Sequence, residues 1–244
     1  MLLNHTLENL MVFAILKKLS TLTACTMLMV AGSTAVARAV DQTLTATDQG
    51  WWSDRDQTTD GGANYIAGMV GQLNYRNFFT FDLSSVTNQS ITSAALRLQR
   101  AEGAGNPVYG LFDVSTPASV LSQKTSNPNP IIFADLGSGT NYGTYNVSTN
   151  GNATDLLTFA LNQNGVRALN ESISNTFSIG GAVINPSTQN QYLFGFSGTS
   201  QAQLELTTEP IPEPIVLPGV LIAFGIGGVL HRKSKAKQRS NSKR

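Results

Sequence analysis

The sequence predicts an all-β fold, a two-sheet β-sandwich at residues 40–210 with one short helix, flanked by an apolar helix near each end of the chain. Three observations predict it. The central residues are rich in Thr, Ser, Asn and Gly, which disfavour long helices. Short alternating or β-branched runs recur along them, and turn residues separate these runs. A stretch of about 171 residues is also the size of one domain.

The first predicted element, within residues 1–39, is a signal helix for export. Lys17 and Lys18 give it a positive start, an apolar run follows to Ala37, and Ala37-Arg38-Ala39 has the small-x-small pattern that signal peptidase accepts. We expect signal peptidase to cleave after Ala39. Translation starts at Met1 or at Met11, because the residues before Met11 add nothing to the signal.

This segment has two alternative interpretations, a retained membrane anchor and a lipoprotein signal. A retained membrane anchor is disfavoured because the run ends in small residues and contains polar Thr and Ser. Leu22-Thr23-Ala24-Cys25 resembles a bacterial lipoprotein box, but the most apolar stretch follows Cys25, whereas a lipidation site should end such a stretch.

About ten runs in residues 40–210 are predicted as strands. The earlier ones are Gln42–Asp48, Asn64–Gly68, Arg76–Asp82, Ile91–Arg100 and Val108–Val114. The later ones are Gly143–Val147, Leu156–Leu161, Thr176–Ile179, Gln191–Phe196 and Gln203–Thr207. Because side chains alternate along a strand, Phe79 and Phe81 should share one face, and Phe78 and Thr80 the other. Further core candidates are Ala94, Leu96, Leu98, Leu111 and Val114.

One helix is predicted, between the expected strands Leu156–Leu161 and Thr176–Ile179. Asn162 can cap a short helix that runs through Ser172, with Val166 and Leu169 on its buried side.

Two neighbouring runs of the body resemble a known module. Tyr75–Ser84 (YRNFFTFDLS) followed by Ile91–Leu98 (ITSAALRL) is similar to the start of the jelly-roll in DNRLRE-type and carbohydrate-binding-like β-sandwiches of secreted bacterial proteins. Leu204-Glu205-Leu206 would be a closing strand. The resemblance implies a jelly-roll sandwich. It implies no active site, because its apolar positions are packing positions.

The last predicted element, within residues 211–244, is a transmembrane helix followed by a basic tail. The apolar run Ile215–Leu230 spans about 24 Å as a helix, slightly less than a typical hydrocarbon core. Its several glycines make the helix marginal, and Pro218 falls in the first turn, where a missing N–H does little harm. The basic tail should stay on the cytoplasmic side, which leaves the body outside.

Pro212-Glu213-Pro214, the apolar run and the basic tail together resemble the PEP-CTERM sorting signal of bacterial exported proteins. The resemblance implies that an exosortase, a membrane-embedded cysteine transpeptidase, recognises this motif and removes the tail. The protein would lie transiently in the inner membrane and then at the cell surface or outside the cell. The alternative is a plain single-pass anchor with chance prolines.

The charge distribution argues against a nucleic-acid partner. The net charge of +1 conceals +2 at residues 1–39, −8 at residues 40–230 and +7 in the tail. A nucleic-acid binder normally shows a basic face, whereas this body is acidic.

The body also offers little chemistry. Residues 40–230 contain neither His nor Cys, which excludes Ser-His-Asp and Cys-His catalysis and His-based metal sites. A paired-carboxylate glycosidase remains formally open, but most carboxylates fall at turns or strand ends. We therefore predict no enzyme and no required cofactor.

The most suggestive segment of the body is Gly50–Gly62. Trp51 and Trp52 alternate faces if extended, so we expect at most one to anchor the core and the other to offer a platform for a sugar ring. Asp54, Asp56 and Asp60 provide oxygen ligands suited to calcium, although their spacing does not match an EF-hand. Ordinary packing and a solvated turn are the competing interpretations.

Two functions for the body remain open. The first is a structural or adhesive β-sandwich of the extracellular matrix. The second is a surface module that binds carbohydrate, such as an exopolysaccharide, through Trp51 or Trp52 with or without calcium.

Overall fold

The structure is a computed structural model that describes residues 38–55, 64–123, 129–186, 189–195, 197–198 and 200–211. The chain divides into two units, Met1–Ala37 and Arg38–Arg244, and every described residue lies in the second. The expected signal helix and transmembrane sorting helix fall outside the described residues. Among the residues that are described, no helix is long and apolar enough to cross a membrane.

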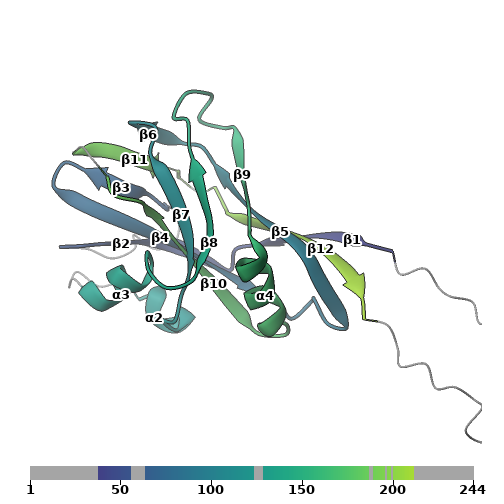
Figure 1. Ribbon diagram of the computed structural model, residues 1–244. Coiled ribbons are helices and arrows are strands. Elements are labelled where there is room, and N and C mark those ends of the chain that lie inside the picture. The colour runs from purple at the N-terminus through teal and green to yellow at the C-terminus, as the bar shows by residue number, and fades with distance from the viewer. Residues whose placement is uncertain are drawn as a thin grey trace, which may run out of the picture. The chain divides into compact units, whose positions relative to one another are not determined.

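Two antiparallel sheets form the body, as Figure 1 shows. The smaller sheet has the order β1 (Val40–Thr45), β12 (Gln203–Pro210), β5 (Gln89–Gln99) and β9 (Leu156–Ala160). The larger sheet runs β6 (Glu102–Ala104), β11 (Asn190–Gly195), β3 (Ala67–Val70), β4 (Leu73–Asp82), β10 (Thr176–Val183), β7 (Val108–Asp113) and β8 (Asn141–Asn146). Off this path, β2 (Asp48–Ser53) pairs with β4.

The main core lies between the two sheets. Phe79, Phe81 and Ile179 of the larger sheet belong to the same buried cluster as Leu96 and Leu204 of the smaller one. Burying each such side chain contributes roughly 1.5–3 kcal/mol, so this layer is the main source of stability. The expected core positions Ala94, Leu98 and Leu111 are also in this cluster.

A second core lies on the other face of the larger sheet. It consists of Trp52, Phe78, Leu121, Ile132 and Leu136. The last three come from α2 (Ala118–Leu121), from α3 (Pro130–Asp135) and from the residue that ends α3. Val114 packs against this second core, where it is partly buried.

A third helix, α4 (Gln163–Glu171), confirms the predicted one. The Asn162 side chain accepts hydrogen bonds from the backbone N–H groups of Asn164 and Gly165, at 2.9 and 3.2 Å. Leu169 is fully buried, and Val166 packs against the main core.

The two-sheet, all-β prediction is confirmed, and each expected run overlaps an observed strand. The expectation of one helix is wrong, because α2 and α3 are also present. The expected strand Gln42–Asp48 is interrupted where the chain crosses between the sheets. There the Ala46 N–H donates to Ala202 O at 2.9 Å, and the Thr47 N–H donates to Thr80 O at 2.8 Å.

Candidate functional site

The predicted sorting and cleavage residues lie at the borders of the described structure. Ala37, Pro212, Glu213 and Pro214 fall outside the described residues. Ala39 is described and exposed, and it directly precedes β1. Cleavage and sorting therefore stay predictions.

The pairing of β1 with β12 brings the two ends of the body together. Val40 pairs with Thr208, and the Thr208 hydroxyl donates to Val40 O at 3.2 Å. Beyond β12, the Ile211 N–H donates to Asn88 O at 3.2 Å. Figure 1 shows β1 and β12 side by side in the smaller sheet. Val40 and Thr208, the strand residues nearest the two predicted processing sites among these pairs, are therefore neighbours in the sheet.

Neither tryptophan is an exposed platform, so that expectation is wrong. Trp52 is 1% exposed and Trp51 is 7% exposed. The two indoles lie on opposite faces of β2, as alternation requires. Trp52 is buried beneath α2 and α3, and its indole N–H donates to Leu121 O at 3.2 Å. The helices that cover this face were not predicted, which is why one indole was expected to be exposed.

Trp51 instead forms a wall of a small pocket of about 190 Å³. We call this the aromatic pocket, and its lining residues are Trp51, Asn64, Ile66, Val70, Tyr75 and Tyr192. The Trp51 and Tyr75 rings meet edge to face, with centroids 5.1 Å apart and planes at 81°. Trp51 Nε1 is buried and has no hydrogen-bond partner in the part of the chain that the structure describes.

Strand pairing assembles this pocket from distant parts of the sequence. Gly68 of β3 pairs with Tyr75 on one side and with Tyr192 on the other. Gly68 has a φ of +107°, and a Cβ there would lie 2.3 Å from Gln191 O. Only glycine permits this approach, so Gly68 is required to bring the two tyrosine strands together.

A chain of hydrogen bonds connects the pocket residue Asn64 to the protein core. Asn64 Oδ1 accepts from the Ser197 hydroxyl at 3.0 Å, and that hydroxyl accepts from the Tyr65 N–H at 3.1 Å. Tyr65 O accepts from the Asn77 amide at 2.8 Å, and Asn77 Oδ1 accepts from the Tyr109 hydroxyl at 2.8 Å. Burial raises the pKa of both tyrosines, so their hydroxyls stay neutral. The network therefore fixes the backbone beside the pocket.

The structure describes only one of the three predicted calcium ligands. Asp54 Oδ1 accepts from the Asn74 N–H at 3.0 Å, and Asp54 Oδ2 lies 4.0 Å from Arg55 Nε. Asp56 and Asp60 lie outside the described residues. Within the described ranges no group of three His, Cys, Asp or Glu side chains could hold a metal ion. Calcium binding here stays a prediction.

A larger depression of about 440 Å³ lies beside α3 and contains Asp135. The Asp135 carboxylate accepts hydrogen bonds from the backbone and hydroxyl groups of Ser115 and Thr116. Burial raises its pKa, but the hydrogen bonds from Thr116 and then Ser115 outweigh burial, so the pKa lies below its usual range. These hydrogen bonds attach the loop that precedes α2 to helix α3. The Asp135 carboxylate is therefore already used in structural contacts.

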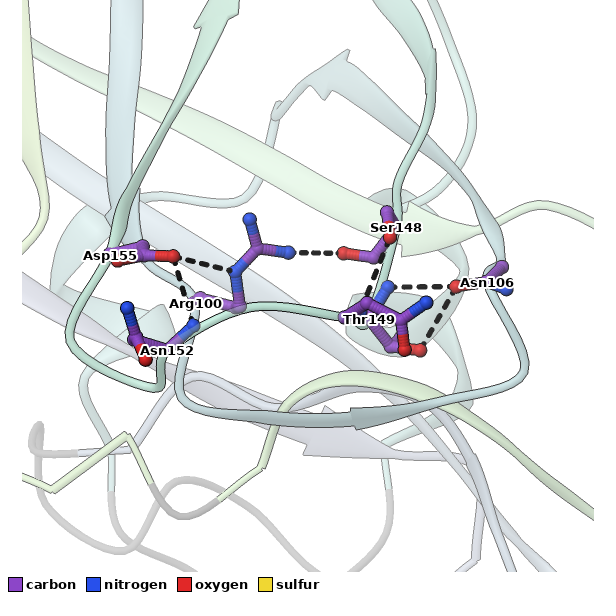
Figure 2. Close-up of polar contacts among 7 residues, drawn as sticks. Arg100, Asn106, Ser148, Thr149, Asn152 and Asp155 are labelled. Carbon is purple, nitrogen blue, oxygen red and sulfur yellow. Dashed lines mark hydrogen bonds and ion pairs between the residues drawn. The ribbon is translucent and has the colours of Figure 1, made fainter.

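A polar cluster at the far end of β5 is likewise structural (Figure 2). Arg100 donates to Ser148 O, and its Nε lies 3.7 Å from Asp155 Oδ2. Asn106 Oδ1 accepts from the backbone and hydroxyl of Thr149, at 2.8 and 3.0 Å. All these groups bind one another across the loop between β8 and β9, so the cluster anchors that loop.

The aromatic pocket is therefore the best candidate site, and sequence reasoning found only Trp51 of its lining. Tyr75 and Tyr192 sit in ordinary aromatic strands, and no local pattern marks them as neighbours. Comparison with known proteins adds no assignment, because no protein-family model matches the chain and a search of curated proteins finds no relative.

Proposed function

We propose that the chain is an exported bacterial protein of the cell surface or extracellular matrix, with a non-catalytic β-sandwich of structural or adhesive role. Signal peptidase cleaves it after Ala39, and an exosortase processes it at Pro212-Glu213-Pro214. Its partners before processing are these two enzymes and the membrane, through the C-terminal helix. A jelly-roll order like that of the DNRLRE-type modules is part of the same proposal.

One observation carries the proposal: an acidic all-β body lies between two basic-flanked apolar segments. The pairing of β1 with β12 supports it, because it brings together Val40 and Thr208, which lie close in sequence to the two predicted processing sites.

Processing is tested by peptide mapping of the extracellular form from the native host. We expect Glu213→Ala to abolish processing, since it removes the only charge of the motif. Glu209→Ala is the matched control, because Glu209 is an exposed carboxylate at the end of β12, outside the motif. Recovery of an intact 215–244 segment from the extracellular protein would refute processing.

Carbohydrate binding is a second candidate, favoured by the aromatic pocket. A pull-down of the full-length chain with the host's exopolysaccharide tests it, with and without a chelator. Retention that a chelator abolishes would support calcium at Asp54, Asp56 and Asp60. Retention that a chelator leaves unchanged favours binding without a metal ion. No retention would leave the structural role alone.

A further inference from the structure

We infer that β1 is an interaction edge at which two copies of this chain pair antiparallel through the same strand, centred on Thr43. The pairing would join the four-stranded sheets of the two copies into one continuous sheet. This inference goes beyond the proposed function, and it is independent of both the export route and the carbohydrate candidate.

The backbone of β1 leaves one edge of the smaller sheet open. β1 is the terminal strand of that sheet, and among the described strands it pairs only with β12. The Ala46 N–H donates to Ala202 O at 2.9 Å, one step beyond the last pair of this ladder. Backbone groups alternate between the two edges of an antiparallel strand. The N–H and C=O groups of Asp41, Thr43 and Thr45 therefore point away from β12, toward the open edge.

The other edge strands of the two sheets are capped, short or buried. In β9, Ala160 O accepts from the Tyr145 hydroxyl at 2.6 Å. In β8, Tyr142 O accepts from the Asn162 N–H at 2.7 Å. Strand β6 has three residues, and every residue of β2 after Asp48 is buried. In the part of the chain that the structure describes, β1 is therefore the longest edge strand without such protection.

The sequence of β1 carries few of the features that keep an edge strand from pairing. VDQTLT contains no Lys, Pro or Gly, and Asp41 is its only charged residue. Its Val and Thr residues favour a strand. Val40 lies on the same face of β1 as Leu44, which packs against the main core, yet Val40 is 50% exposed. It is one of four large apolar side chains that are exposed among the described residues, and a neighbouring strand would cover it.

The strand is complementary to itself when two copies are centred on Thr43. Hydrogen-bonded pairs must join outward-pointing residues, so Thr43 faces Thr43 of the second copy and Asp41 faces its Thr45. This register uses every outward N–H and C=O group of the three residues. It also places Thr opposite Thr, a favourable cross-strand pair, and keeps the two Asp41 carboxylates apart.

The neighbouring registers are less favourable. A shift of two residues sets Thr45 opposite Ala39, which lies outside β1. A shift of four residues sets the two Asp41 carboxylates opposite each other, which is destabilising. The centred register forms about six backbone hydrogen bonds over a small interface. Interfaces below about 1,200 Å² are typical of transient complexes, so we expect a dimer with a Kd of about 0.1 mM.

Two proline variants of the full-length protein, purified in detergent, test the edge. Thr43→Pro removes an outward N–H that the second copy would bind. It should leave the bonds between β1 and β12 intact, because Pro is tolerated where the N–H of a strand points away from the sheet. Analytical ultracentrifugation should show that the dimer of Thr43→Pro is at least about tenfold weaker than that of the unmodified chain.

Thr158→Pro is the matched control. Thr158 is an exposed residue of β9, the other edge strand of the same sheet. Its N–H also points outward, because the Leu161 N–H donates to Ala94 O at 2.8 Å and backbone groups alternate along the strand. Thr158→Pro should therefore leave the dimer unchanged. Thermal unfolding of both variants shows that each is folded.

Cysteine cross-linking tests the register. Cys25 is the only cysteine of the chain, so each variant is made in a Cys25→Ser background. In the centred register, Thr43→Cys places the two thiols on facing residues with Cα atoms about 5.5 Å apart, within the range of a disulfide. Mild oxidation should link Thr43→Cys at least about tenfold faster than Thr158→Cys. Asp41→Cys and Thr45→Cys should link to each other in a mixture, and neither should link to itself.

Three results would overturn the inference: an unmodified chain that stays monomeric from about 10 µM to about 1 mM, equal effects of the two proline variants on the dimer, or cross-linking of Thr43→Cys no faster than that of Thr158→Cys. Cross-linking of Thr43→Cys to another host protein in place of a second copy would also overturn it, and would assign the edge to that protein. Processing is tested separately by peptide mapping, so either idea can fail without the other.

Discussion

At the scale of single residues, the pKa values of two carboxyl groups, Asp48 and Asp135, are shifted in opposite directions. Burial raises the pKa of Asp48, against the opposing effect of its hydrogen bond from the Gln49 N–H, and Asp48 Oδ2 has no partner among the described residues. The pKa of Asp135 lies below its usual range because hydrogen bonds from Thr116 and Ser115 outweigh burial. The charged form is therefore disfavoured at Asp48 and favoured at Asp135.

We predict opposite effects for the two isosteric variants. At pH 7 Asp48→Asn should raise the free energy of unfolding and Asp135→Asn should lower it. The contribution of Asp135 is present above its unfolded pKa and is lost as the pH falls through its lower folded pKa. The penalty at Asp48 is present above its raised folded pKa and vanishes below the unfolded value near 3.9. Urea unfolding at pH 7 and pH 3 measures the change in the free energy of unfolding for each variant. If both variants changed it in the same direction at pH 7, the prediction would be contradicted.

Asn77 joins the pocket to the core, and its replacement should be costly. It is fully buried, and Asn77→Ala would leave both Tyr65 O and the Tyr109 hydroxyl without this partner. We expect a loss of about 2–4 kcal/mol in the free energy of unfolding. Asn152→Ala, at an exposed site, should stay within about 0.5 kcal/mol. A loss at Asn77 no greater than at Asn152 would show that the network is not structural.

At the scale of elements, the sequence predicted the strands better than the helices. Alternation placed Phe79 and Phe81 together in the main core, because it depends only on neighbours in the chain. It could not show that Phe78, on the other face, is buried as well. That burial depends on α3, whose beginning at Asn129 and Pro130 has the residue types of a turn, although Asn129 caps the helix. The neighbouring strand β2 was not predicted either. Both of its faces are buried, so its sequence does not alternate between apolar and polar residues.

The attachment of α3 to the larger sheet depends on Arg76. Its guanidinium donates to Phe133 O and Ala134 O at 2.8 and 2.9 Å and lies 4.3 Å from the centre of the Phe133 ring. Arg76→Met should lower the stability of α3 by about 1–3 kcal/mol. Arg76→Lys should recover only part of the loss, because an ammonium group lacks the planar guanidinium that lies over the Phe133 ring.

Hydrogen exchange can separate this local effect from global unfolding. We expect faster exchange at the α3 amide of Phe133 and at Leu136 in Arg76→Met, with β5 and β12 unchanged. Gly180→Ala offers an independent check, because the added Cβ would lie 2.7 Å from Leu136 O and push the same segment away. Uniform acceleration across both sheets would contradict a local role for Arg76.

At the scale of the whole body, the candidate site and the chain ends depend on long-range pairing. Tyr75 and Tyr192 become neighbours only because β3 pairs with both β4 and β11. Val40 and Thr208 become neighbours only because β1 pairs with β12. Local sequence patterns identify strands, but the partners of a strand are set by the packing of the entire sandwich. This is why the sequence predicted the fold class but only one residue of the pocket. It did not predict that Val40 and Thr208 are neighbours.

The close fit of β12 to its sheet leads to the last prediction. Glu209 and Pro210 pair with Ser90 and Gln89, and Ile211 is bonded to Asn88, so the chain is held up to the residue before Pro212. A processing enzyme that binds the motif as an extended peptide must therefore work against the surface of the body. A Gly-Ser spacer of about five residues between Ile211 and Pro212 adds up to roughly 17 Å of reach. Processing in the native host, followed by pulse-chase, should become faster.

A matched control separates the effect of a greater distance between the body and the motif from other effects of the spacer. The same spacer inserted between Pro214 and Ile215 lengthens the chain equally, but the motif still directly follows Ile211, so this insertion should not accelerate processing. If both insertions act alike, or if the first slows processing, then the enzyme reads the motif together with the end of β12. Glu209 and Pro210, exposed at that end, would then become the first residues to test for recognition.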